Sequence, residues 1–104
     1  MELGISTDPR PECYLIAVEG EVDISNADAL RQAVDLALEQ PVEQVKLDFG
    51  GVSYIDSTGI GVLVGAARRA GERGKGFSVA NVGASVMRIV QLLGVDREMD
   101  ISAA

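Results

Sequence analysis

The residues best suited to chemistry in this sequence form a short polar interruption of an apolar run. In YIDSTGIGVLVGAA, residues 54–67, the polar triplet Asp56, Ser57 and Thr58 is followed by apolar residues and glycines. Such a pattern could belong to a phosphate-binding loop, a dinucleotide site, a serine nucleophile or a serine that another enzyme phosphorylates. Each possibility requires particular partner residues, which can be sought in the sequence.

The glycines do not complete a nucleotide-binding motif. A P-loop needs Ser or Thr after its lysine, but Gly76 follows Lys75, and Arg69 stands where the first glycine belongs. The dinucleotide pattern Gly-x-Gly-x-x-Gly is approached, with one residue too many in the second gap, by Gly59, Gly61 and Gly65. A small-ligand or nucleotide binder therefore stays open only as a minor alternative.

Enzyme chemistry at Ser57 lacks the groups that it needs. Ile55 replaces the leading glycine of a Gly-x-Ser-x-Gly elbow, and the chain has no histidine and one cysteine. These counts remove His-based acid/base catalysis, Ser-His-Asp and Cys-His pairs and His/Cys metal sites. We therefore expect no catalytic residue, no metal and no cofactor, and we expect Cys13 to be a small buried hydrophobe in a reduced compartment.

Composition indicates the setting of the domain. The 104 residues suit one domain, 1–104, and 47% of them are hydrophobic, enough for a core. A net charge of −7 disfavours nucleic acid and anionic lipid as partners. The longest apolar stretch, Ile60–Ala67, is too short to span a bilayer, and no basic-then-apolar leader begins the chain. These features predict a cytoplasmic domain without membrane insertion.

Strand and helix patterns alternate along the chain. Turn residues at Asp8–Pro11 predict a hairpin, and Gly50 and Gly51 predict a turn or kink. The expected strands are 2–7, 13–18, 45–49 with 52–55, 77–81 and a short one around Met99 and Ile101, and the expected helices are 25–40, 58–70 and 84–93. The pattern predicts an α/β domain with a mixed central sheet of four to five strands and at least three helices.

Residues at the helix ends predict caps. Ser25 with Asp28 suggests a capping box, and Gly94 is expected just after the third helix. In that helix Val86, Ile89, Val90 and Leu93 are expected to face inward. Ser57 is expected to cap the second helix, a role worth about 1 kcal/mol that would by itself explain a serine there.

The second helix carries two stripes. The stripe expected to face the sheet contains Ile60, Leu63, Val64 and Ala67, and the other contains Thr58, Gly61, Val62, Gly65 and Arg69. Two glycines in a helix cost roughly 2 kcal/mol relative to alanine. Close packing of this helix on its own sheet and docking of another protein on its smooth outer face are both consistent with that cost.

The segment VKLDFGGVSYIDSTGIGVLVGAARRA, residues 45–70, resembles the signature of the anti-sigma factor antagonist family, which has the STAS fold. Residues 18–34 and 79–101 are similar to the family's first helix region and to its later strand, third helix and last strand. The most specific part is Asp-Ser-Thr-Gly-Ile-Gly, residues 56–61. The chain departs from the family in ending at Ala104, where many members continue into a further helix, and in having Met99 where an aromatic residue is common.

The resemblance implies a switch controlled by phosphorylation. In such proteins the serine at the position of Ser57 is phosphorylated by an anti-sigma factor that is an ATP-dependent serine kinase, and a serine phosphatase restores it. The unphosphorylated form binds the anti-sigma factor and releases the sigma factor. Carried over by position, Asp56 would position Ser57, and Asp23 would lie near the partner. The expected partner-binding residues are Asp23, Asp56, Ser57, Thr58, Gly59, Gly61, Val62, Gly65 and Arg69.

A second hypothesis keeps the fold and changes the partner. The chain would then be a STAS subunit that acts as a docking module on a membrane lipid transporter or in another signalling complex. The hydroxyl of Ser57 favours the first hypothesis, since a purely structural subunit has no need of a phosphorylatable residue. Either way the chain is expected to be a monomer or a weak dimer.

Overall fold

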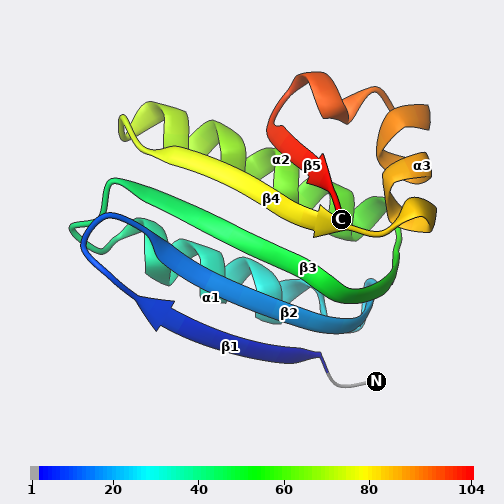
Figure 1. The fold of residues 1–104 in the computed structure, drawn as a ribbon, viewed down its shortest axis with the longest axis horizontal. Helices are drawn as coiled ribbons and strands as arrows, with labels where there is room; N and C mark the ends of the chain where they lie inside the picture. The colour runs from blue at the N-terminus through cyan, green and yellow to red at the C-terminus, as the bar shows by residue number, and fades with distance from the viewer. Residues whose placement is uncertain (1–2) are drawn as a thin grey trace.

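The strands lie side by side in the order in which they occur in the chain. The computed structural model describes residues 3–104, which form one five-stranded sheet in the order β1-β2-β3-β4-β5 (Figure 1). Strand β1 is antiparallel to β2, and the other three neighbouring pairs are parallel. The predicted α/β class with a mixed sheet and three helices is confirmed. The elements are β1 Gly4–Pro9, β2 Tyr14–Val22, α1 Ala27–Leu38, β3 Gln44–Ile55, α2 Ser57–Glu72, β4 Gly76–Val82, α3 Ala84–Leu92, a 3-10 turn Val95–Arg97 and β5 Asp100–Ala103.

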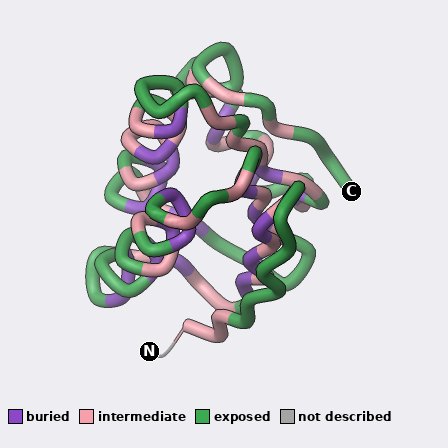
Figure 2. The backbone as a smooth tube through the Cα atoms, turned by 90° about the vertical axis from the view of Figure 1, so that its left-hand side faces the viewer, coloured by how far each residue is buried: buried purple, intermediate pink, exposed green. Residues whose placement is uncertain are grey.

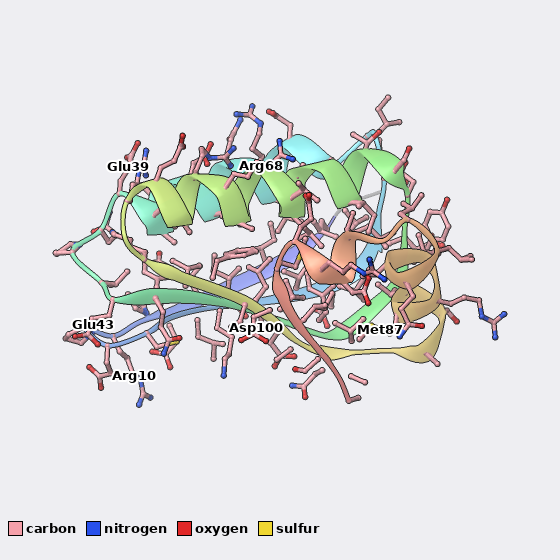
Figure 3. All side chains as sticks on the ribbon, turned by 90° about the horizontal axis from the view of Figure 1, so that it is seen from above. Arg10, Glu39, Glu43, Arg68, Met87 and Asp100 are labelled. Atoms are coloured by element: carbon pink, nitrogen blue, oxygen red, sulfur yellow. The ribbon has the colours of Figure 1, made fainter. Side chains whose placement is uncertain are left out.

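Helices α1 and α2 cover one face of the sheet, and the opposite face carries no helix within residues 3–104 (Figure 3). Helix α3 lies at the end of the sheet toward which β4 runs (Figure 1). Side chains alternate along the strands, so that Ile16, Val45, Leu47 and Phe49 are fully buried under the helices. In Figure 2 the buried stretches, drawn in purple, lie where the helices and the strands face each other.

The hairpin of β1 and β2 is confirmed, but the turn lies later than predicted. Pro9 still pairs with Tyr14, so the chain reverses over residues 10–13, where the Cys13 N–H donates to the Arg10 carbonyl at 3.2 Å. Pro9 is tolerated as the last residue of β1 because β1 is an edge strand. Position 2 of the predicted first strand lies outside the described residues. Cys13 was predicted to be a small buried hydrophobe, but in this turn it is only half-buried.

Strand β3 continues through the two glycines that were predicted to be a turn or kink. The pairing shifts from Ala17 opposite Asp48 to Glu19 opposite Gly51, so β3 has one more residue than β2 over this interval and bulges. A side chain on Gly51 would place its Cβ 2.6 Å from the Cβ of Glu19. The glycine is therefore required by a close approach inside the sheet, and the strand extends to Ile55.

The predicted capping box of the first helix is wrong. Helix α1 begins at Ala27 with Asn26 as its N-cap, and the Ser25 hydroxyl donates to the Asp23 carboxylate instead. The Asp28 carboxylate accepts hydrogen bonds from Arg31 and Gln32 on the same helix. Both side chains of the expected box thus have other partners.

Helix α3 matches its predicted end but not its predicted inner face. Gly94 follows the helix in a left-handed conformation with φ of 73°, as predicted. Val86 and Val90 are buried and Ile89 is half-buried, whereas Leu93 is 54% exposed. Leu93 is the C-cap residue of this helix and lies at the surface, so its predicted inward position is wrong. The last strand includes Ile101 as predicted, and Met99 precedes it.

A lysine in the loop before β4 donates hydrogen bonds to carbonyl groups at the C-terminal end of α1. The segment between the expected helix 58–70 and the expected strand 77–81 is shorter than predicted, because α2 continues to Glu72 and β4 begins at Gly76. The Lys75 ammonium donates to the carbonyl of Leu38 at 2.7 Å and also to the carbonyl of Gln40. A cation there satisfies carbonyls left free at a helix C-terminus.

Candidate functional site

The chain brings two loops together at the carboxyl ends of β2 and β3. Because these strands are parallel and Val22 pairs with Ile55, the residues that follow each strand meet at the same end of the sheet. The Asp56 N–H donates to the Val22 carbonyl at 3.1 Å. Asp23 and Ser57, more than thirty positions apart in the sequence, thus belong to one surface region.

Asp56, and not Ser57, caps helix α2. The backbone of Asp56 is extended, and its Oδ1 accepts from the Gly59 N–H at 3.0 Å, while its Oδ2 accepts from the Ile24 N–H at 3.2 Å. Ser57 is the first helical residue, so its predicted cap role is wrong. The carboxylate satisfies the helix end and also holds the β2–α1 loop. Capping therefore does not account for the serine.

Ser57 and Thr58 are exposed in the first turn of α2. Backbone N–H groups at a helix N-terminus and the helix dipole favour negative charge at this position. A phosphate on the Ser57 oxygen would lie in such a place without being buried by the domain. The local geometry is compatible with modification in the folded state.

Asp23 is ordered by its own loop. Its carboxylate Oδ1 accepts from the Ser25 hydroxyl and from the Ser25 N–H, the latter at 2.9 Å, and its N–H donates to Asn26 Oδ1 at 2.9 Å. The hydrogen bond from the Ser25 hydroxyl, followed by that from its N–H, lowers the pKa of Asp23 below its usual value. Within residues 3–104 neither Asp23 nor Asp56 is in a salt bridge. Negative charge therefore lies beside Ser57 without a compensating cation from these salt bridges.

The inner face of α2 is rotated from the predicted stripe. Ile60 and Leu63 are buried as predicted, but Val64 and Ala67 are only half-buried. The other buried residues of the helix are Gly59, Ala66 and Ala70. Helix α1 packs beside α2, so the contact face lies between the sheet and the neighbouring helix.

The glycines of α2 serve different purposes. A Cβ on Gly59 would lie 2.6 Å from Ile55 Cγ1 and 2.7 Å from Val22 Cγ1, so this glycine is required by close packing. A Cβ on Gly61 would meet nothing within 4 Å, and one on Gly65 would meet only the end of the flexible Arg69 side chain at 3.1 Å. Close packing on the sheet is therefore the wrong explanation for Gly61, whose position leaves the outer surface flat.

Arg69 has a partner within the domain. Its Nη2 lies 2.7 Å from Asp35 Oδ1 on α1, and Arg31 Nη1 lies 3.7 Å from Asp35 Oδ2. The ion pair of Arg69 with Asp35 joins α1 and α2. Sequence periodicity did not indicate this contact. Among the predicted partner-binding residues, Asp23, Asp56, Ser57 and Thr58 lie together, Gly61 and Val62 continue along α2, and Gly65 and Arg69 lie further toward its C-terminus.

Sequence reasoning missed one exposed apolar side chain at this end of the sheet. Ile24, in the loop that Asp56 holds, is 78% exposed. An isoleucine between polar residues in a loop after a strand was the available signal. Residues 3–104 contain no group of three or more His, Cys, Asp or Glu side chains placed to hold a metal ion. In the same range, no helix has both the length and the apolar character needed to cross a membrane.

A protein-family model described as "Mlab, STAS domain" matches residues 5–101. The chain belongs to the STAS domain family. A curated relative of this STAS domain is the anti-sigma-B factor antagonist of Bacillus subtilis (strain 168). The two are 27% identical over 103 residues, which are 99% of this chain and 94% of the relative.

Solved structures share the fold of this STAS domain. An anti-sigma factor antagonist from Mycobacterium paratuberculosis aligns with a TM-score of 0.88 at 21% identity, over 99% of this chain and 87% of that one. The anti-sigma factor antagonist SpoIIAA in its unphosphorylated form aligns with a TM-score of 0.79 at 22% identity, over 94% and 87%. SpoIIAA from Bacillus in its phosphorylated form aligns with a TM-score of 0.73 at 21% identity, over 94% and 90%.

Proposed function

We propose that this STAS domain, residues 1–104, is an anti-sigma factor antagonist switched by phosphorylation of Ser57. The unmodified form binds an anti-sigma factor and thereby releases a sigma factor. The same anti-sigma factor acts as the kinase: the γ-phosphoryl group of ATP passes to the Ser57 oxygen, ADP leaves, and the hydroxyl proton is released. A serine phosphatase hydrolyses the phosphate and restores the binding form.

The observation that carries the proposal is the position of Ser57. Its side chain is exposed at the start of α2, and Asp56 performs the capping that would otherwise explain a serine there. The names of the curated relatives and of the structural neighbours support the same function. One neighbour, SpoIIAA, was solved in both an unphosphorylated and a phosphorylated form, which supports a phosphorylation switch in proteins of this fold.

Charge explains how the switch would act. Phosphorylation adds about −1.5 to −2 charges. The helix N-terminus tolerates that charge within the domain, but Asp23 and Asp56 already make this surface negative. Burying the phosphate in an interface without a matching cation would cost several kcal/mol. Phosphorylation therefore ends partner binding without unfolding the domain.

The chain is, in this proposal, a cytoplasmic regulator. Ser57 is a substrate of the kinase, and the chain contributes no catalytic residue, metal or cofactor of its own. The partner-binding surface contains the acidic end at Asp23 and Asp56 and the flat outer side of α2 at Gly61 and Val62.

The proposal is tested by reconstituting partner exchange. A labelled sigma factor bound to the anti-sigma factor from the same genome is titrated with the unmodified domain and with the Ser57-phosphorylated domain, and fluorescence anisotropy follows release. We expect release by the unmodified form and none by the phosphorylated form. Failure of both forms to bind any anti-sigma factor, together with retention of the domain by a transporter ATPase, would replace this function with the docking-module hypothesis.

A further inference from the structure

Ile24 is exposed but held in place. Its side chain is 78% exposed, while its N–H donates to Asp56 Oδ2 at 3.2 Å. On either side, Asp23 accepts from Ser25, and Asn26 Nδ2 donates to the Glu21 carbonyl at 2.8 Å. The loop therefore holds the backbone of Ile24 in place, which lowers the backbone entropy lost when a partner binds this side chain.

The surroundings of Ile24 indicate the chemistry of its partner. The neighbouring carboxylates of Asp23 and Asp56 are not in salt bridges within the described chain. An apolar side chain bordered by charge matches the core and rim of a protein interface. A complementary surface must offer an apolar pocket bordered by Arg or Lys that pair with Asp23 and Asp56, since an acidic border would repel these carboxylates. The two carboxylates engage those cations, so a phosphate on Ser57 still lacks a matching cation.

The same carboxylate links Ile24 to the proposed phosphorylation site. Asp56 binds the Ile24 N–H with one oxygen and caps α2 with the other, and Ser57 is the next residue. When a protein binds Ile24, Ser57 consequently lies in a defined position beside the bound protein. Of the other exposed apolar residues, Leu36 lies on α1 and Leu92 and Leu93 lie at the end of α3. Tyr54 lies on β3 close to this site but is less exposed, at 45%.

We propose that Ile24 is the apolar anchor by which this STAS domain docks on its serine kinase, in a pocket bordered by cationic side chains. This inference rests on the function proposed above and adds a specificity residue to it. Docking through Ile24 supplies the affinity, and the link through Asp56 places the Ser57 hydroxyl for phosphoryl transfer. Ile24 itself takes no part in that transfer.

The test compares Ile24→Ala with Leu92→Ala. Leu92 is the matched control because it is 79% exposed, almost the same as Ile24. Initial rates of phosphorylation by the anti-sigma factor kinase with ATP and Mg²⁺ are measured over a range of domain concentrations. For Ile24→Ala we expect KM to rise by about tenfold with little change in kcat, as loss of an interface anchor predicts. For Leu92→Ala we expect values within about twofold of the unmodified sequence.

Ile24→Leu and Ile24→Lys complete the test. The leucine variant keeps an apolar group and should regain most of the lost kcat/KM, whereas lysine should be at least as weak as alanine. Circular dichroism and thermal melts should be unchanged for all variants, since the side chain is exposed. Equal kcat/KM for the original sequence and Ile24→Ala would overturn the anchor while leaving the function standing. No phosphorylation of the original sequence would overturn the proposed function, and the anchor with it.

Discussion

At the scale of single residues, Asp56 and Ser57 divide two tasks that one serine could have combined. Asp56 caps α2 and binds the loop at Ile24, whereas Ser57 stays exposed. A serine that capped the helix would have its oxygen engaged with a backbone N–H. Shifting the cap by one residue leaves the hydroxyl available to an external enzyme.

Replacing Asp56 tests whether its two hydrogen bonds, rather than its negative charge, stabilise the domain. Asp56→Ala removes the acceptors for Gly59 and Ile24, and should lower the free energy of unfolding by about 1–2 kcal/mol. Asp56→Asn keeps one acceptor oxygen and should lose less. Urea denaturation measures both values. Equal losses in the two variants would contradict a role through hydrogen bonding.

The hydrogen bonds to Asp23 predict that the stability of the folded domain depends on pH. A carboxyl whose pKa is lowered by folding contributes stability above its unfolded pKa, near 3.9, and this contribution is lost as pH falls through the folded pKa. Ser25→Ala removes the hydroxyl, the main cause, so the pKa of Asp23 should rise toward its usual value. NMR titration of the Asp23 carboxyl carbon measures this shift. An unchanged titration curve in Ser25→Ala would contradict the assignment of its cause.

At the scale of elements, the glycines of α2 illustrate what a pattern can and cannot reveal. Helical periodicity separated an inner stripe from an outer one, but it placed Gly59 on neither of them. The structure requires Gly59 for packing against Val22 and Ile55 and leaves Gly61 in open space. The difference depends on how closely α2 approaches the sheet, which no local pattern contains.

Alanine substitutions at these two glycines should act in opposite directions. Gly59→Ala forces a Cβ into the core and should cost about 1–3 kcal/mol. Gly61→Ala meets no neighbour and should stabilise the helix by up to about 1 kcal/mol, because alanine has the higher helix propensity. Thermal or urea unfolding of the pair provides the measurement.

The proposed docking face adds a further expectation for Gly61→Ala. If the flat surface receives the anti-sigma factor, the variant should bind it more weakly although the fold is more stable. Binding can be measured by calorimetry with the same protein used for unfolding. Unchanged affinity would place Gly61 outside the interface.

Lys75 connects two elements through carbonyl groups. Lys75→Met keeps the apolar stem but leaves the carbonyls of Leu38 and Gln40 without their charged donor, and should cost about 1–3 kcal/mol. Lys46→Met is the matched control, because it removes the same charge from a half-buried position on β3. Similar losses in the two variants in thermal melts would show that net charge, rather than the cap, is responsible.

At the scale of the whole molecule, the order and type of the elements could be predicted because they depend on local periodicity. Strands of alternating apolar residues and helices of 3.6-residue period were recognisable one at a time. The N-cap positions Asn26 and Asp56 were missed because a serine one position away fits the same local pattern. The bonds of Lys75 were missed because its carbonyl partners are more than thirty positions away in the sequence. The Ile24–Asp56 hydrogen bond joins residues 32 positions apart. The sequence thus predicted the end of the sheet where the site lies, but not which side chains are engaged there.

The phosphorylated molecule should keep its fold. The phosphate would lie at a helix N-terminus on the surface, so the far-ultraviolet circular dichroism should be unchanged and the melting temperature close to that of the unmodified domain. Loss of the cooperative transition on phosphorylation would contradict a switch that works by local charge.

The central claim is that Ser57 is the phosphate acceptor, and intact mass spectrometry tests it most directly. The domain and its Ser57→Ala variant are incubated in parallel with ATP, Mg²⁺ and the anti-sigma factor kinase from the same genome. The account predicts one added phosphate on the original sequence and none on the variant. Phosphate on both proteins, or on neither while both still bind the kinase, would contradict it.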